Sequence, residues 1–561
     1  MLRDILFSLL IFFATVPGLG WLLARRLPFA PAEKICTAAA LAVLGVFLFA
    51  WADYVFALPV AALWALPVLG AASLALGWRS LADAWRDADA HALVIGQLLV
   101  TGWCVGWLAT IASYSGGGWA GDWFEHWERV RFFLERAPLD QKFLGHDLLT
   151  ARPPLANVVT GAFLAVTRVD FAHFQLIFTL LASLAFLPAG LLARRFGRGS
   201  GAIAVCAALF MVSPLFVQNA TFAWTKLPAA FLVLTALYFF LRAQEPGAPT
   251  SAALLFAASL AAALLAHYSA GPYAVMLALG WLWLGWPRRD QTEWRRATAL
   301  GVITGALVLA VWFGWSVRHY GMRATFLANS SVEAAEKYSG SQFEKIALNV
   351  RDTLVPHFLR WADAAFIAQS SPWGHWRDWF FQCYQLNLPL ACGSVAWLAI
   401  LVELRHVARG TGARPRAFWW AFAVGVILLG VATHGARDTW GLTHICLQSF
   451  VLLALAFLAA RWNALSRAWR LALLAGATVD FVLGIALHFG VQSYALDRWL
   501  AADRPPEELF HSYNEPAFMN LAAKIHHQLS FLADEPALPL AVILAALAGI
   551  LALTLNRARQ A

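Results

Sequence analysis

Charged residues are scarce in this chain. Of its 561 residues 13% are charged and 61% are hydrophobic, whereas a soluble domain has about a quarter charged and half apolar residues. Apolar runs of about twenty residues, the length that a helix needs to cross a bilayer core, recur along the whole chain. The composition excludes a soluble protein and predicts an all-α polytopic membrane protein.

Paired cysteines, internal repeats and Pro- or Ser-rich linkers are also lacking. The six cysteines show no CxxC or similar spacing, so we expect neither a zinc knuckle nor a disulfide framework. The net charge is +9, but the basic residues are dispersed in short loops, as the charge bias of cytoplasmic loops requires. We therefore expect membrane lipids and no nucleic acid among the partners.

The apolar runs predict about fifteen membrane spans. They are 4–24, 35–56, 59–78, 93–113, 172–193, 200–217, 227–243, 250–268, 271–286, 299–317, 386–404, 417–434, 442–460, 470–489 and 537–555. Strict alternation of these spans places every Arg-rich short loop on one side, which is therefore cytoplasmic. Residues 153–170 are predicted to form an interfacial helix on the outer surface, because a span there would move Arg194 and Arg195 outside.

Ionisable residues are concentrated in one stretch, 116–154, between two apolar runs. An ionisable group in hydrocarbon costs about 2.5 kcal/mol or more, so these side chains must face water, a headgroup or a polar substrate. We expect the centre of any active site here. The thirteen residues are Asp122, Glu125, His126, Glu128, Arg129, Arg131, Glu135, Arg136, Asp140, Lys142, His146, Asp147 and Arg152.

Residues 122–134 have the pattern of an amphipathic helix. Asp122, Glu125, His126 and Arg129 follow the spacing i, i+3, i+4 and i+7 and share one face, while tryptophans and aliphatic residues form the other. The pattern predicts a helix lying flat on the membrane with its polar face toward water. The same pattern fits an ordinary solvated face with i,i+4 ion pairs. The preceding GGGWAG, which permits a tight turn and close approach of a ligand, favours a site.

The order of these features resembles a known family. The acidic residue that opens an outer segment is followed by RPPL at 152–155, LLARRFGRG at 191–199 and SPLFVQNATFAWTKLPAAFLVLTALYFFL at 213–241. Together they are similar to the GT-C fold glycosyltransferases, especially the protein mannosyltransferase and aminoarabinose transferase branch (family 39 and relatives). The resemblance covers roughly residues 93–320. It divides the chain into extra N-terminal spans (1–92), a GT-C-like catalytic core with the outer loop 114–171 (93–320), and a C-terminal region with outer segments 318–385 and 490–536 (321–561).

The resemblance implies transfer of a sugar, with inversion, from a polyprenyl-phosphate carrier to a hydroxyl of a glycan, lipid or protein outside the cytoplasm. A carboxylate would act as general base on the acceptor, and cations would take up the charge of the leaving phosphate. Asp122 matches the family's base by position. The second acidic residue of the family is adjacent, but here it comes at Glu125, which could share the base role, bind a metal or orient Arg129.

Further candidates follow for the metal and the phosphate. A divalent cation is a possible cofactor, with His126, His146 and Asp147 as its ligands beside Glu125, although no ligand spacing is diagnostic. For the carrier phosphate the candidates are Arg129, Arg152, Lys226 and, more weakly, His267, and in the second outer segment Arg351 and His357. Lys226 could equally be a snorkelling interface anchor.

Two other functions are compatible with the sequence. An O-antigen-type polymerase or ligase would concentrate its function in a late outer loop, whereas the ionisable cluster here comes early. A transporter or flippase of lipid-linked sugars would carry charges at mid-membrane. Asp480 is the main residue of that kind, and one buried hydrogen bond would also explain it. The Arg- and Ala-rich composition favours a bacterial inner membrane, with the active site facing the periplasm.

Overall fold

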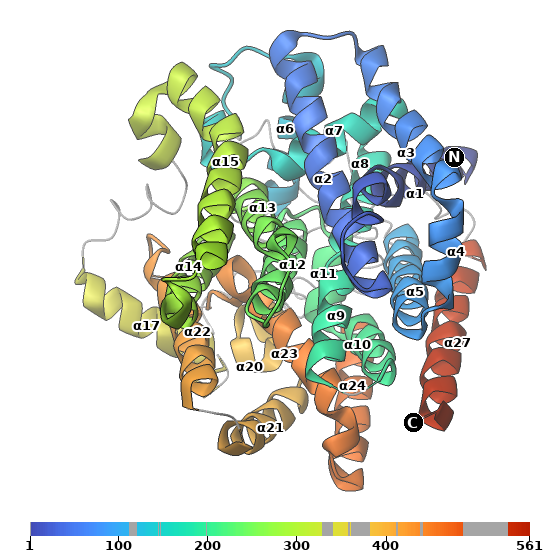
Figure 1. Ribbon diagram of the computed structural model, residues 1–561, viewed down its shortest axis with the longest axis vertical. Coiled ribbons are helices and arrows are strands. Elements are labelled where there is room, and N and C mark those ends of the chain that lie inside the picture. The colour runs from blue at the N-terminus through green and yellow to red at the C-terminus, as the bar shows by residue number, and fades with distance from the viewer. Residues whose placement is uncertain are drawn as a thin grey trace, which may run out of the picture.

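The computed structural model describes residues 2–110, 120–143, 145, 147–197, 199–327, 340–356, 359–360, 382–410, 413–437, 441–485 and 537–560; within α6 the side chains are described from Glu125 onward. This part of the chain is built of helices (Figure 1). The longer ones are α1 Leu2–Ala24, α2 Pro31–Phe56, α3 Ala65–Leu76, α4 Trp78–Arg86, α5 Ala88–Thr110, α6 Ala120–Glu135, α7 Leu155–Val166, α8 Phe171–Ser183, α9 Phe186–Phe196, α10 Gly201–Val212, α11 Pro214–Thr221, α12 Lys226–Ala243, α13 Thr250–Ala266, α14 Gly271–Gly285, α15 Thr292–Leu327 (with a kink at Gly321), α17 Gln342–Leu354, α21 Ala396–Gly410, α22 Ala413–Ala432, α23 Gln448–Arg461, α24 Arg467–Ile485 and α27 Ala537–Gln560.

Short helical segments join several of these helices. Two of them are π-helices, a form that is rare in proteins and frequent at functional sites. The short segments are η1 Val60–Trp64, η3 Leu149–Ala151, η4 Tyr268–Ala270, η5 Trp286–Arg288, α20 Leu388–Ala391 and η9 Trp462–Ala464, and the π-helices η7 Gln382–Leu386 and η8 Thr443–Leu447.

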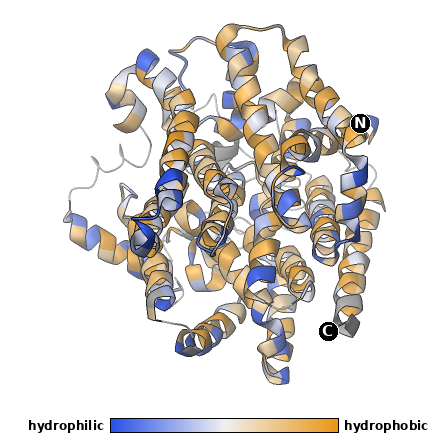
Figure 2. Cartoon of the chain, viewed as in Figure 1, coloured by the Kyte–Doolittle hydropathy of each residue, from blue (hydrophilic) through white to orange (hydrophobic). Residues whose placement is uncertain are grey.

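The helices confirm an integral membrane protein. In the described part of the chain nine helices are long and apolar enough to cross a membrane, or eleven if each of two bent pairs is one span. Hydrophobic residues predominate along them (Figure 2). The predicted all-α polytopic class is confirmed. About fifteen spans were predicted over the whole chain, and some of them are broken or short in the structure: α10 and α11 are separated by a 68° bend, and α13 is a shorter apolar helix.

The centre of the bundle is formed by α8, α9 and α12. The apolar window of α8 and α9 is 100% buried and that of α12 is 83% buried, against 17% for α15 and 28% for α22 and α27. Helices that are apolar all round belong in the interior, and α12 indeed packs on α13, α23, α9 and α8. The outward faces of α15, α22 and α27 are left for lipid.

The predicted interfacial segment 153–170 contains α7. With twelve residues α7 is about 18 Å long, too short for a hydrocarbon core of about 30 Å, as expected of a helix that does not span. Its position on the surface was predicted wrongly, however. Nearly all of its residues are buried, because α6, α2 and α8 pack around it.

The N-terminal helices hold α6 in place. Arg136, directly after α6, has a positive φ of 51°, and its guanidinium donates to the carbonyl oxygens of Leu58 (2.5 Å) and Asp53 (3.2 Å) and lies 3.4 Å from the Asp53 carboxylate. Because α2 packs on α7 as well, the N-terminal helices help to position the ionisable stretch 116–154.

Candidate functional site

The polar face of α6 turns into the protein. Glu125, His126 and Arg129 are only 0%, 3% and 1% exposed, so the predicted orientation toward water is wrong for this face. The reason is tertiary: residues 148–157 fold over it and supply polar partners that replace water. Glu125 and Arg129 do form an i,i+4 ion pair, one of the alternatives that the sequence left open.

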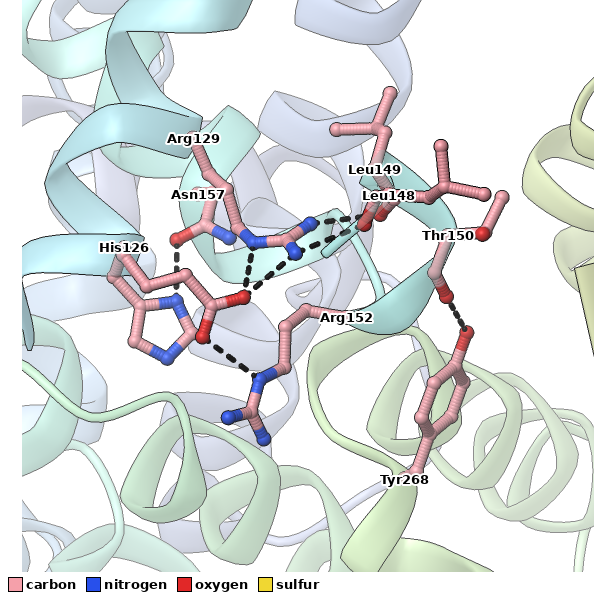
Figure 3. A network of polar contacts seen from close by, with 9 residues as sticks. His126, Arg129, Leu148, Leu149, Thr150, Arg152, Asn157 and Tyr268 are labelled. Carbon is pink, nitrogen blue, oxygen red and sulfur yellow. Dashed lines mark hydrogen bonds and ion pairs between the residues drawn. The ribbon is translucent and has the colours of Figure 1, made fainter. Parts of the chain in front are cut away.

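Glu125 is shared by two guanidinium groups. Figure 3 shows Arg129 and Arg152, which both point toward this carboxylate, drawn without a label between them. Arg129 Nε donates to Glu125 Oε1 at 2.8 Å, and Arg152 Nε donates to Oε2 at 3.2 Å. The other nitrogens of Arg129 donate to the carbonyl oxygens of Leu149 (2.7 Å) and Leu148 (3.0 Å), and its guanidinium lies 4.3 Å from the centre of the Phe143 ring. The carboxylate therefore fixes both arginines, and Arg129 in turn fixes the 148–149 backbone.

These contacts decide the protonation of Glu125. Burial alone would raise its pKa, but Arg152 and Arg129 outweigh burial and lower the pKa to about 2. A carboxylate that is ionised this firmly is a weak general base at neutral pH. Of the three roles open to Glu125, the geometry favours orientation of arginines, both Arg129 and Arg152.

His126 lies beside this pair and is neutral. Burial, followed by the charges of Arg152, Arg129 and Lys226, outweighs the opposing effect of Glu125 and lowers the pKa of His126 to about 3. Its Nδ1 is 3.2 Å from Asn157 Oδ1 on α7, which corresponds to the tautomer with the proton on Nδ1. A neutral imidazole can bind a metal or donate a hydrogen bond.

The metal site stays a prediction. His146 lies outside the described residues, and among the residues that are described no three His, Cys, Asp or Glu side chains gather as a metal site would need. Asp147 is buried. Its backbone pairs with Phe143 in both directions at 2.9 Å across a turn in which Gly145 has φ 78°.

Lys226 and His267 join the cluster from the other side. Lys226, the first residue of α12, is 7% exposed, and its Nζ lies 4.2 Å from the centre of the Trp224 ring. His267 follows α13, and its Nδ1 accepts from the Ser269 amide at 3.0 Å. Burial, then the charges of Lys226 and Arg152, lower the pKa of His267 well below its usual value. Lys226 is thus a member of the cluster, not an isolated interface anchor.

A pocket of about 340 Å³ opens beside Arg152 and His267, which is within the usual size range of ligand sites. Four segments meet there, 151–153, 267–275, 429–434 and 445–446. The lining residues are Ala151, Arg152, Pro153, His267, Tyr268, Ser269, Gly271, Pro272, Val275, Leu429, Gly430, Thr433, His434, Ile445 and Cys446. A small group of polar side chains thus converges in a mostly apolar cavity.

Arg351 is not brought to the cluster. On α17 it pairs with Asp352, 2.5 Å from Nη2 to Oδ1, and of the described contacts none joins it to Glu125 or to the pocket. The same helix touches the pocket wall elsewhere, since Lys345 Nζ donates to the carbonyl oxygen of His434 at 2.8 Å. His357 lies outside the described residues. Asp122 is placed on α6, one turn before Glu125, but its side chain is not described.

The far half of the pocket was missed from the sequence. Thr433, His434 and Cys446 come from the end of α22 and from the π-helix η8, almost 300 residues after Arg152. The run THGARDTWGLTH at 433–444 joins the two segments and is rich in polar residues, so it was the available signal. A π-helix has no sequence signature of its own.

No family model matches the chain, and no curated protein matches it. Among solved structures it is similar to ArnT from Cupriavidus metallidurans bound to undecaprenyl phosphate, with 17% identity over 80% of this chain and 78% of that one and a TM-score of 0.47. The apo form of the same protein gives 18% identity over 86% and 76%, with a TM-score of 0.45.

Proposed function

We propose that this chain is an integral-membrane glycosyltransferase that moves a sugar from a polyprenyl-phosphate carrier to a hydroxyl acceptor at the outer face, with inversion. The observation that carries the proposal is the pair Arg129 and Arg152 held on the buried Glu125, with the buried Lys226 near enough to His126 to lower its pKa, beside a mostly apolar pocket. Arg129 and Arg152 share the Glu125 carboxylate, and Lys226 adds a further positive charge beside His126. Such an arrangement suits an anion whose other end is apolar.

The charge of the cluster fits the leaving group. A phosphate monoester carries about −1.5 to −2 at neutral pH, and guanidinium and ammonium groups, as in Arg152 and Lys226, are the side chains that bind such a charge. Charge that develops on the leaving phosphate is stabilised most when the cations are already fixed in a water-poor site. Glu125 supplies this fixation, because it holds two of the three cations without needing to move.

The base on the acceptor hydroxyl is Asp122 in this proposal. Asp122 and Glu125 are three residues apart on α6, so they lie on neighbouring positions of one face. The two carboxylates would then divide their roles: Glu125 is committed to the arginines, whereas Asp122 activates the acceptor. The acceptor is a glycan, lipid or protein, and the membrane is the inner membrane of a bacterium with the site toward the periplasm.

A transfer assay tests the proposal. Purified protein in detergent and lipid is given radiolabelled sugars on polyprenyl phosphates, including undecaprenyl phosphate, the ligand in one of the similar structures. Wild type should release carrier phosphate, and Asp122→Asn should not, at unchanged melting temperature. A parallel series with EDTA tests the predicted metal. Turnover by Asp122→Asn at the wild-type rate would show that Asp122 is not the general base. A folded wild-type protein that releases no carrier phosphate from any donor would overturn the proposed function.

A further inference from the structure

A row of polar side chains runs along α17. Lys345, Asn349 and Thr353 are spaced four residues apart, so they share one face of the helix. All three are buried, whereas Gln342 and Glu344 at the start of α17 are exposed. Buried polar groups in a native fold have hydrogen-bond partners. The partners of this row therefore indicate which part of the chain α17 stabilises.

The first two side chains of the row bind the backbone that follows α22. Lys345 Nζ donates to the carbonyl oxygen of His434 at 2.8 Å, and Asn349 Nδ2 donates to the carbonyl oxygen of Ala436 at 3.0 Å. The helices α17 and α22 also lie side by side (Figure 1). One face of α17 is thus attached to the end of α22 at two successive points.

The third side chain binds the start of the next helical segment. The Leu442 amide donates to Thr353 Oγ1 at 3.1 Å, and Gly441, directly before it, has φ 111°. A Cβ added to Gly441 would collide with the carbonyl oxygen of Leu386 and come within 2.9 Å of that of Asp352. The backbones of α17, of η7 and of the residues before η8 are therefore in close contact.

Segments 433–436 and 441–446 form the far wall of the pocket. Thr433 and His434 line the cavity from the first segment, and Cys446 lines it from the second. The row on α17 binds main-chain groups of both segments, so it fixes the course of this backbone whatever side chains the wall carries. The width of the cavity is thereby coupled to the position of α17.

We propose that α17 shapes this pocket, with Lys345 and Asn349 as positioning residues for the donor that binds in it. The inference rests on the proposed function, in which the donor occupies the pocket, and gives the outer segment 318–385 a part in the site. This part differs from the phosphate contact expected of Arg351, which pairs with Asp352 on the same helix. Without its donors the buried backbone of the wall must find other partners, and the wall moves.

The thiol of Cys446 reports the position of the far wall without any turnover. It lines the pocket, and its Sγ donates to the carbonyl oxygen of Leu442 at 3.3 Å, so a small thiol reagent should label it only slowly in wild type. Lys345→Met and Asn349→Leu each remove one hydrogen bond to the wall. Both variants should raise the labelling rate of Cys446 severalfold, measured at each cysteine by mass spectrometry.

Internal controls separate this effect from loss of the fold. Cys104 and Cys206 are 0% exposed on α5 and α10, so they should stay unlabelled as long as the bundle is folded. Lys345→Arg keeps a donor for the wall and should restore slow labelling, and Glu344→Gln, on the exposed side of α17, should behave as wild type. Wild-type labelling of Cys446 in both variants would overturn the inference, as would equal labelling of all three cysteines.

Transfer kinetics test the consequence for the donor. Lys345→Met and Asn349→Leu should raise KM for a polyprenyl-phosphate sugar about two- to tenfold, the effect of one hydrogen bond, and leave kcat nearly unchanged. An unchanged KM in variants whose Cys446 is labelled faster would overturn the positioning role. A wild-type protein that turns over no donor would overturn the proposed function instead, and the labelling of Cys446 would still decide whether α17 shapes the pocket.

Discussion

Arg152 links Glu125 to the pocket. Its Nε lies 3.2 Å from Glu125 Oε2, twenty-seven residues earlier in the chain, and its side chain also lines the cavity. The position of Arg152 in the lining is therefore held by a carboxylate that does not itself line the cavity. Several consequences of this relationship can be measured.

Replacement of Glu125 should be costly. Glu125→Gln leaves the buried Arg129 without its carboxylate, and loss of one partner of a buried pair costs about 3–5 kcal/mol. We expect a strongly lowered melting temperature in detergent. The control is Glu135→Gln, which breaks the Arg131–Glu135 pair of the same i,i+4 spacing on the same helix. That pair is about half exposed, so its loss should cost about 0.5 kcal/mol or less. Equal effects of the two variants would contradict the burial of the Glu125 cluster.

Stability should fall with decreasing pH in two overlapping ranges. The pKa of His126 is lowered to about 3, so between about 6.5 and 3 the unfolded chain binds a proton that the folded chain does not, and acid destabilises the fold. The pKa of Glu125 is lowered to about 2. The contribution of the ionised Glu125 to the free energy of unfolding is complete above about pH 4.5 and is lost as the pH falls toward 2.

The His126→Gln variant separates the two effects. Its melting temperature should depend less steeply on pH between 6.5 and 4.5 than that of wild type, since Gln cannot be protonated. His267, whose pKa is also lowered, will retain part of the slope. Parallel profiles of wild type and His126→Gln would contradict a buried neutral His126.

Much of the ionisable stretch 116–154 could be recognised from the sequence, because its residues are close together in the chain. Scarcity of charge elsewhere made 116–154 conspicuous, and the spacing of Glu125 and Arg129 included their pairing among the open alternatives. The direction in which this face points depends on residues 148–157, which cover it, and helical periodicity distinguishes two faces without saying which is buried. The second half of the pocket depends on the packing of α22 and η8 against residues 267–275, a contact that no local pattern encodes.

Asp480 should have a structural role. The Tyr384 hydroxyl donates to its Oδ1 at 2.6 Å and the Ser394 amide to its Oδ2 at 2.9 Å, which supports the simpler of the two explanations open from the sequence. Asp480→Asn and Tyr384→Phe should each lower the melting temperature and leave the transfer rate per folded molecule unchanged. Selective loss of activity in folded Asp480→Asn would instead support a proton relay and with it a transporter.

The most direct test of the account is the affinity for undecaprenyl phosphate without a sugar. Arg152→Gln should bind it about 10- to 100-fold more weakly than wild type, the effect expected for one charge-assisted hydrogen bond. Arg152→Lys should recover part of the loss, and Arg168→Gln, at a residue 59% exposed and paired with Asp4 and Asp170, should bind as wild type does. Wild-type affinity in folded Arg152→Gln would contradict a phosphate site at this cluster.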